Sequence, residues 1–255
     1  MSQVNRQVIL QTRPAGLPRE SDFAVVESAL PEPGPGEVLL QTHFTSVDPY
    51  LRGIMREGPG YLGSVSPGEV VPAGSVGQIL KSNNPAFQPG EFAAGMWGWQ
   101  EFACAAPNQL TRVDPALAPI STALGVLGMP GMTAYFGLLD LGKPKPGETV
   151  FVSGAAGAVG SLVGQIAKIQ GCRVAGSAGS DAKVQHLIED LGFDAAFNYK
   201  TESDLGGRLR ALCPDGVDVY FDNTGGAMTD AVLLQINNFA RIVLCGQIAQ
   251  YNETE

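Results

Sequence analysis

The sequence predicts an α/β protein in which a β-rich N-terminal domain is followed by a doubly wound parallel sheet. Three observations predict this fold class. The first 120 residues are interrupted often by Gly and Pro, the second half alternates apolar strands with amphipathic helices, and a glycine turn at 154–160 joins the first of those strands to its helix. We therefore expect two domains, at 1–125 and 126–255.

The N-terminal domain is predicted from short β-type runs between turn signals. The runs "EVLLQTHF", "GSVGQILKS" and "MWGWQEFACAA" are separated by stretches such as "PEPGPGEV" and "NNPAFQPGEF". Short strands with closely spaced turns are typical of a barrel or a sandwich, and the pattern does not distinguish the two.

The second half has a helical pattern over 121–142, which we expect to be interrupted at 129–131, and then a regular alternation of elements. The helix after the glycine turn is predicted to end at Gly171, and the next one to begin at Ser180 or Asp181 and end at Gly192. Strands are expected near 149–153, 172–178, 195–199, 217–221 and 241–245. A complete dinucleotide-binding sheet has six strands, so we expect either a shortened fold or a fragment that lacks the C-terminal part.

Composition excludes several classes of partner. The formal net charge of −9 argues against nucleic acid, and the absence of 18 consecutive apolar residues argues against a membrane span. The first ten residues lack the pattern of a secretion signal, and four scattered cysteines suit a reducing cytoplasm. The two histidines, His43 and His186, are not close to a cysteine in the sequence, so we expect structural roles for both and no zinc site.

The glycine turn predicts a site for a pyrophosphate. Gly154, Gly157 and Gly160 lie between an apolar strand and an amphipathic helix, where backbone N–H groups and the helix N-terminus attract anions. Ala155 occupies the first position of the usual G-x-G-x-x-G motif. The alternative is a tight turn that selects small residues for packing alone.

The residues after the second strand of this half favour a 2′-phosphate. NAD-specific sites usually have a carboxylate there for the ribose hydroxyl, whereas this chain has 177–180 as Ser-Ala-Gly-Ser, followed by Lys183. Tyr199 ends the third strand and has Lys200 beside it. NADPH is therefore predicted over NADH, the alternative for Lys183 being a solvated residue on a helix surface.

Longer motifs in fixed order resemble a known family. The stretches "SVDPYLRGIM", "GMPGMTAYFGL", "SGAAGAVGSLVGQIAK", "LGFDAAFNYK", "GVDVYFDNTGG" and "LCGQIAQYN" are similar to those of the zinc-independent medium-chain reductases, in the group of prostaglandin, alkenal and curcumin reductases. The resemblance covers nearly the whole chain. It implies a GroES-like N-terminal barrel, a Rossmann domain and NADPH-dependent reduction of an enone C=C bond.

The resemblance also implies roles for individual residues. Tyr251 is the candidate donor to the enolate oxygen, and its alternative is a surface or interface tyrosine. Tyr50, Tyr61 and Trp97 are candidates for the substrate pocket, with core packing as the alternative for Tyr50 and Trp97. The remaining candidates are expected along the cofactor: Thr133, Ala156, Gly157, Ala158, Val159, Lys183, Tyr199, Asn223, Cys245, Gly246, Gln247, Ile248 and Tyr251.

The predicted function is the reduction of α,β-unsaturated ketones or aldehydes with NADPH. Two alternatives stay open at this point, a quinone reductase of the same superfamily and a catalytically silent NADPH-binding protein. The family commonly continues beyond residue 255 with a segment that carries a dimer contact, so a homodimer is an open expectation.

Overall fold

The computed structural model describes residues 4–58 and 63–253, which belong to two compact units. Unit 1 comprises Met1–Leu124 together with Asn252–Glu255, and unit 2 comprises Gly125–Tyr251. The chain thus leaves unit 2 directly after Tyr251, whereas the division expected from the sequence kept all of 126–255 together. None of the described helices has the length and apolar character needed to cross a bilayer.

Unit 1 is built on an antiparallel sheet of five strands in the order β6–β3–β4–β5–β7. A separate two-stranded ribbon makes single bridges, Gln7–Gln100 and Ile9–Val70, to residues that precede β6 and β4 in the chain. The ribbon strands are β1 (Val4–Leu10) and β2 (Phe23–Ala29). The sheet strands are β3 (Val38–Thr45), β4 (Ser75–Ser82), β5 (Phe92–Gly95), β6 (Phe102–Ala105) and β7 (Leu110–Val113).

Short helical segments connect these strands, namely η1 (Glu20–Asp22), α1 (Leu51–Ile54), η2 (Pro107–Gln109) and η3 (Ile120–Leu124). Within the β-type run "MWGWQEFACAA", only Phe102–Ala105 is a strand of the sheet. Gly98 has a φ of +82°, and a Cβ there would lie 2.5 Å from the Val71 carbonyl oxygen. The chain therefore turns at Gly98 instead of continuing as a strand.

Unit 2 is a parallel sheet in the order β10–β9–β8–β11–β12, so the predicted Rossmann-like α/β class is confirmed. The order reverses between β8 and β11, and ligands of such sheets bind at the carboxyl ends of the strands around this point. The strands are β8 (Thr149–Val152), β9 (Arg173–Ala178), β10 (Ala195–Asn198), β11 (Val217–Asp222) and β12 (Ile236–Leu244).

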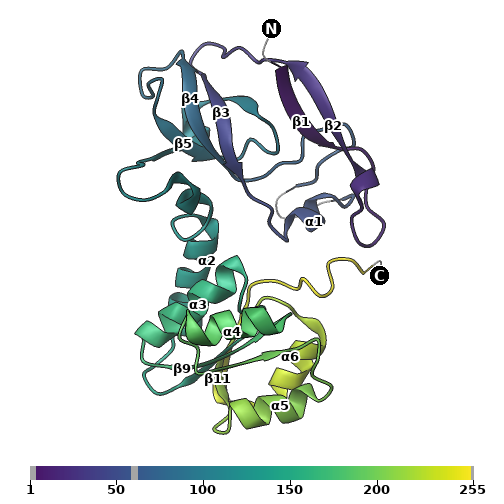
Figure 1. The fold of residues 1–255 in the computed structure, drawn as a ribbon, viewed down its shortest axis with the longest axis vertical. Coiled ribbons are helices and arrows are strands. Elements are labelled where there is room, and N and C mark those ends of the chain that lie inside the picture. Colours follow the sequence, from purple (N-terminus) through teal and green to yellow (C-terminus); the bar gives the residue numbers. More distant parts are fainter. Residues whose placement is uncertain (1–3, 59–62, 254–255) are drawn as a thin grey trace. The chain divides into compact units, whose positions relative to one another are not determined.

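Helices cover both faces of this sheet, as Figure 1 shows. Side chains alternate along β8, so that Val150 and Val152 pack with α3 (Ala158–Ile169) and α4 (Asp181–Glu189) in one apolar cluster. Phe151 points the other way into a second cluster, with side chains of α5 (Leu205–Leu212) and α6 (Gly226–Leu233). The strands are therefore buried on both sides, which explains their continuous apolar runs.

Two elements differ from the prediction. The helical stretch is not interrupted at 129–131; instead α2 (Met129–Phe136) begins there and continues as a π-helical segment, Gly137–Gly142. Pro130 lies in the first turn of α2, where its missing N–H leaves no hydrogen bond unmade. The fifth strand is longer than expected and pairs irregularly with β11 near its start.

Candidate active site

The glycine turn has the backbone geometry expected of an anion site. Gly154 has a φ of +59°, and a Cβ on Gly160 would lie 2.5 Å from the Gly154 carbonyl oxygen, so helix α3 starts in direct contact with the turn. Gly157 is the N-cap residue and provides no side-chain capping bond. The first N–H groups of α3, from Ala158 and Val159, lack intrahelical acceptors and are oriented toward an incoming anion.

The alanine in the motif is accommodated by the neighbouring strand. Ala155 is fully buried, and a Cβ on Gly176 of β9 would lie 2.7 Å from the Ala155 Cβ. The Phe193 ring fills the remaining space, since a Cβ on Gly176 would lie 2.9 Å from it and a Cβ on Gly164 only 2.0 Å. The turn is thus held by close packing of α3, β9 and Phe193.

The end of β9 brings neutral and basic groups together. Gly179 follows the strand, and a Cβ there would lie 3.3 Å from both the Tyr199 hydroxyl oxygen and Cε of Lys200. Ser180 caps α4 by accepting the Lys183 N–H at 3.4 Å, and the Lys183 side chain is exposed in the first turn. The carboxylate of Asp181 is engaged by Asn198 Nδ2 at 2.8 Å.

The end of β11 contains a buried carboxylate that the sequence analysis did not single out. Asp222 is 1% exposed, and its Oδ1 accepts hydrogen bonds from the Ser153 hydroxyl (3.0 Å) and from the N–H groups of Thr224 and Gly225 (2.9 Å each). Oδ2 accepts the Thr229 hydroxyl at 2.6 Å. Burial alone would raise the pKa of Asp222, but these hydrogen bonds outweigh it and lower the pKa below its usual value.

Ser153 and the backbone carbonyl of Asp222 hold the residues predicted near the nicotinamide. Asn223 donates its N–H to Ser153 Oγ (2.9 Å) and its side-chain amide to the Ser153 carbonyl (2.8 Å). Cys245 and Gly246 both donate their N–H groups to the Asp222 carbonyl oxygen, at 2.8 and 3.0 Å. The ends of β8, β11 and β12 are therefore fixed together by one network.

Tyr251 lies at the same end of the sheet as this network. Its hydroxyl oxygen accepts the Gln247 N–H at 3.3 Å and would lie 3.2 Å from a Cβ on Gly246. Ile248, in the same turn, is 46% exposed. The structure thus brings Asn223, Cys245 and Tyr251 together, as the sequence led us to expect, although their roles toward a ligand stay predictions.

The surroundings of Cys245 raise the pKa of its thiol. The residue is exposed as a whole, but partial burial of the thiol raises its pKa, and the Asp222 carboxylate acts in the same direction. Thr133 lies half-buried on α2 and contacts the Met129 sulfur at 3.6 Å.

The candidates in unit 1 have different surroundings. Trp97 is 9% exposed, packs in the core of the five-stranded sheet and donates its indole N–H to the Thr42 hydroxyl at 2.8 Å. It also lines a cleft of about 560 Å³ between the ribbon and the sheet. Tyr50 caps α1 and packs against an apolar cluster that includes Leu51 and Ile54. Tyr61 lies outside the described residues.

Comparisons with known proteins agree with this architecture. A model for the N-terminal domain of oxidoreductases matches residues 6–113, and a model of zinc-binding dehydrogenases matches 158–255. Mouse prostaglandin reductase 1 is 48% identical over 245 residues, covering 94% of this chain and 71% of the relative. The NADP(+)-dependent 2-alkenal reductase of tobacco is 47% identical over 254 residues, with 97% and 74% covered.

A solved structure shows the same fold with cofactor. CurA from Vibrio vulnificus in complex with NADPH is 44% identical to this chain and superposes with a TM-score of 0.94, over 98% of this chain and 74% of the CurA chain. The chain belongs to the zinc-independent medium-chain reductases. It falls in their group of prostaglandin, alkenal and curcumin reductases, and it spans about three quarters of the length of these relatives.

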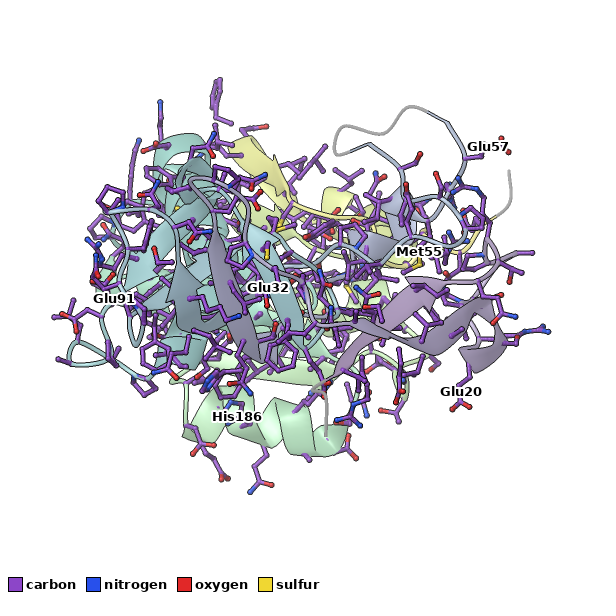
Figure 2. All side chains as sticks on the ribbon, turned by 90° about the horizontal axis from the view of Figure 1, so that it is seen from above. Glu20, Glu32, Met55, Glu57, Glu91 and His186 are labelled. Atoms are coloured by element: carbon purple, nitrogen blue, oxygen red, sulfur yellow. The ribbon has the colours of Figure 1, made fainter. Side chains whose placement is uncertain are left out.

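The match to a model of zinc-binding dehydrogenases raises the question of whether this chain has residues that could bind a metal ion. One matching model is described as a zinc-binding dehydrogenase. In residues 4–58 and 63–253, however, no group of three or more His, Cys, Asp or Glu could hold a metal ion. His43 lies in β3 with its ring edge-on to Phe92, and His186 projects from α4 and pairs with Asp190 (Figure 2).

The turn and the end of β9 fit the NADPH expected of this family. No side chain caps the N-terminus of α3, and the lack of a Cβ on Gly160 lets the helix pack directly against the turn. Beyond β9 the Asp181 carboxylate accepts a hydrogen bond from the Asn198 amide, while Tyr199 and Lys200 lie beside Gly179. A dianionic group beside Gly179 would meet a cation and a hydroxyl.

Proposed function

We propose that this chain is an NADPH-dependent reductase of the C=C bond of α,β-unsaturated ketones and aldehydes. The observation that carries the proposal is the end of β9, where Tyr199 and Lys200 lie beside Gly179 and Lys183 follows in the first turn of α4. The names of the relatives support the reaction type, because two of them reduce alkenals and prostaglandins.

The residues of unit 2 divide the task of binding the cofactor. The backbone of 156–159 would hold the pyrophosphate, Lys183 and Tyr199 the 2′-phosphate, and Asn223 with 245–248 the nicotinamide side. Thr133 is proposed at the same nicotinamide end. Bound NADPH supplies a hydride to the β-carbon of the enone.

The remaining task is to stabilise the enolate oxygen that develops as the C=C bond is reduced. Without a metal, a hydroxyl donor has to perform it. Tyr251 is proposed for this role, because its hydroxyl lies beside Gly246 and accepts the Gln247 N–H at the edge of the sheet where the nicotinamide is proposed. Tyr50, Tyr61 and Trp97 are proposed to line the pocket.

The finer expectations on partners and location are part of the same proposal. The four cysteines are free thiols, which supports a reducing compartment such as the cytoplasm. A net charge of −9 supports a small-molecule substrate over nucleic acid. A homodimer stays a prediction.

Steady-state assays test the reaction. The 255-residue chain is incubated with NADPH and either an alkenal, a 15-oxo-prostaglandin-like enone or a quinone, and NADPH oxidation is followed. We expect turnover of the enones with loss of their C=C bond. Faster quinone turnover with inert enones would replace the proposal by a quinone reductase, and cofactor binding without any turnover would replace it by a silent binding protein.

A further inference from the structure

Ser153 holds Asn223 through two separate hydrogen bonds. It follows β8 directly and is fully buried. Its hydroxyl accepts the Asn223 backbone N–H at 2.9 Å, and its carbonyl oxygen accepts the Asn223 side-chain amide at 2.8 Å. The same hydroxyl donates to Asp222 Oδ1 at 3.0 Å, so the roles of its proton and of its oxygen are both assigned. The backbone and the side chain of Asn223 are therefore both fixed to the end of β8.

The bond to the Ser153 carbonyl decides which way the Asn223 amide is turned. A carbonyl oxygen can only accept, so the atom next to it must be the donor Nδ2, and Oδ1 takes the other position of the amide. Within residues 4–58 and 63–253, no donor is hydrogen-bonded to this Oδ1. Asn223 is half-buried, and the oxygen is accessible at the surface. The side chain therefore presents an oriented acceptor to a ligand.

Asn223 lies between the glycine turn and the residues proposed for the nicotinamide side. A Cβ on Gly154, in the turn, would lie 3.5 Å from the Asn223 Cβ. On the other side, a Cβ on Gly246 would lie 3.2 Å from the Asn223 carbonyl oxygen. In NADPH, the group between the pyrophosphate and the nicotinamide is a ribose. Its hydroxyl groups can donate a hydrogen bond, which is what the Asn223 oxygen requires.

From these contacts we infer that Ser153 is a positioning residue, which directs the Asn223 amide oxygen to a hydroxyl of the nicotinamide ribose. Ser153 acts through Asn223, because its own hydroxyl is engaged by Asp222 and by the Asn223 N–H. This role rests on the proposed NADPH site but not on the proposed reaction. All of the contacts that carry it lie within unit 2.

The competing interpretation is that Ser153 only stabilises the fold through Asp222. Thr229 separates the two roles, because its hydroxyl donates to Asp222 Oδ2 at 2.6 Å and, among the described residues, forms no hydrogen bond with Asn223. Ser153→Ala and Thr229→Val each remove one hydroxyl from the same carboxylate, so urea unfolding should show comparable losses of stability. Only Ser153→Ala also removes a contact of Asn223. Thr229→Val is therefore the matched control.

Three ligands distinguish the parts of the cofactor. They are NADPH, 2′-phospho-ADP-ribose, which lacks the nicotinamide, and 2′,5′-ADP, which also lacks the ribose next to it. Isothermal titration calorimetry gives the Kd of each. We expect Ser153→Ala to weaken the binding of the first two ligands by about fivefold, as for the loss of one hydrogen bond, and to leave 2′,5′-ADP within about twofold. Thr229→Val should leave all three within about twofold.

Asn223→Ala completes a double-mutant cycle. In this background Ser153→Ala should cost no further affinity for NADPH, because the amide that Ser153 orients is absent. Asn223→Asp replaces the donor Nδ2 by an oxygen that faces the Ser153 carbonyl, so it should bind NADPH no better than Asn223→Ala. This variant leaves Ser153 in place and so decides the matter even if Ser153→Ala does not fold. Additive losses, or an Asn223→Asp variant with unchanged affinity, would overturn the inference.

The pattern of losses separates this role from the proposed function. A loss for NADPH alone would move the Asn223 oxygen to the nicotinamide and overturn the assignment to the ribose. No loss in Ser153→Ala, equal losses for all three ligands, or the same losses in Thr229→Val would also overturn it. If the expected pattern appears in a protein that reduces no enone, only the proposed reaction fails. If none of the three ligands binds, both proposals fail.

Discussion

The ends of β9 and β11 lie at the same edge of one parallel sheet, yet they treat carboxylates in opposite ways. At β9 the chain continues through Gly179 and Ser180, and Tyr199 and Lys200 lie over the backbone. At β11 it ends on Asp222, which is fully buried and accepts hydrogen bonds from two hydroxyls and two N–H groups. One end is left open for an anion, and the other encloses an anion of its own.

The difference shows that the position of a carboxylate decides whether it acts on ligand binding or on stability. A carboxylate at the end of β9 would face a ligand, so it would decide which dinucleotide binds. The carboxylate at the end of β11 faces only the protein, so it joins Ser153 after β8 to the turn that leads into α6 and contributes to stability. Five predictions test this comparison, in order of decreasing effect.

Replacing Asp222 by Asn should have the largest effect. The new amide keeps one acceptor but turns a donor toward hydroxyl and N–H donors, so buried groups lose their partners, at a cost of about 2–4 kcal/mol. Urea unfolding measures the free energy of unfolding of each variant. Asp230→Asn, on the exposed side of α6, is the control, and equal unfolding midpoints for both variants would contradict the prediction.

The stabilising effect of the Asp222 carboxylate should also depend on pH. The pKa of Asp222 is lowered in the folded protein. Its contribution to the free energy of unfolding is therefore fully present above the pKa that this carboxyl group has in the unfolded chain. It is lost as pH falls through the lower, folded value. The difference in unfolding free energy between the unmodified protein and Asp222→Asn should therefore shrink only in acid, below the usual pKa of aspartate.

Introducing a carboxylate at the end of β9 should reverse the preference for NADPH over NADH. Ser180→Asp keeps a good N-cap for α4 but adds a negative charge, so NADPH affinity should fall by about 1–3 kcal/mol while NADH affinity changes little. Kd values from fluorescence titration report this. Ser180→Asn is the neutral control, and an equal loss in both variants would mean that the cap, not the charge, is responsible.

Removing the cation of Lys183 should have a similar or smaller effect. Lys183→Ala is expected to erode the preference for NADPH over NADH by about 1–3 kcal/mol, the value of a charge-assisted hydrogen bond. Lys145→Ala serves as the control, because Lys145 precedes β8 and so lies at the opposite edge of the parallel sheet from Lys183. Equal Kd values for the two cofactors in the unmodified protein would already count against the assignment.

Tyr199→Phe should have the smallest effect. It removes only a neutral hydroxyl beside Gly179, so NADPH binding should weaken by about 0.5–1.5 kcal/mol with no change for NADH. Isothermal titration with both cofactors measures it. A loss of the same size for NADH would show that the ring packs for the adenosine and that the hydroxyl does not contact the 2′-phosphate.

The fold of unit 2 could be predicted in detail because its signals are local. The 3.6-residue period of α3, the cap at Ser180 and the glycine at 171 each act over a few residues. The β1–β2 ribbon and the turn at Gly98 were missed, since they depend on contacts between residues far apart in the chain.

In the candidate site, too, local features could be predicted and long-range contacts could not. The glycine turn and the neutral end of β9 are visible as motifs, but the role of Asp222 depends on Ser153, about 70 residues earlier. The only signal for it was the polar run "FDNTGG" after a strand.

One tightly packed space is filled by the side chains at four positions, Ala155, Gly164, Gly176 and Phe193. A larger side chain at one position requires a smaller one at another, because Cβ atoms on the two glycines would lie within 2.9 Å of the Phe193 ring. A family alignment should therefore show these four columns changing together. A randomised library should recover a larger residue at position 176 only alongside a smaller one at both 155 and 193.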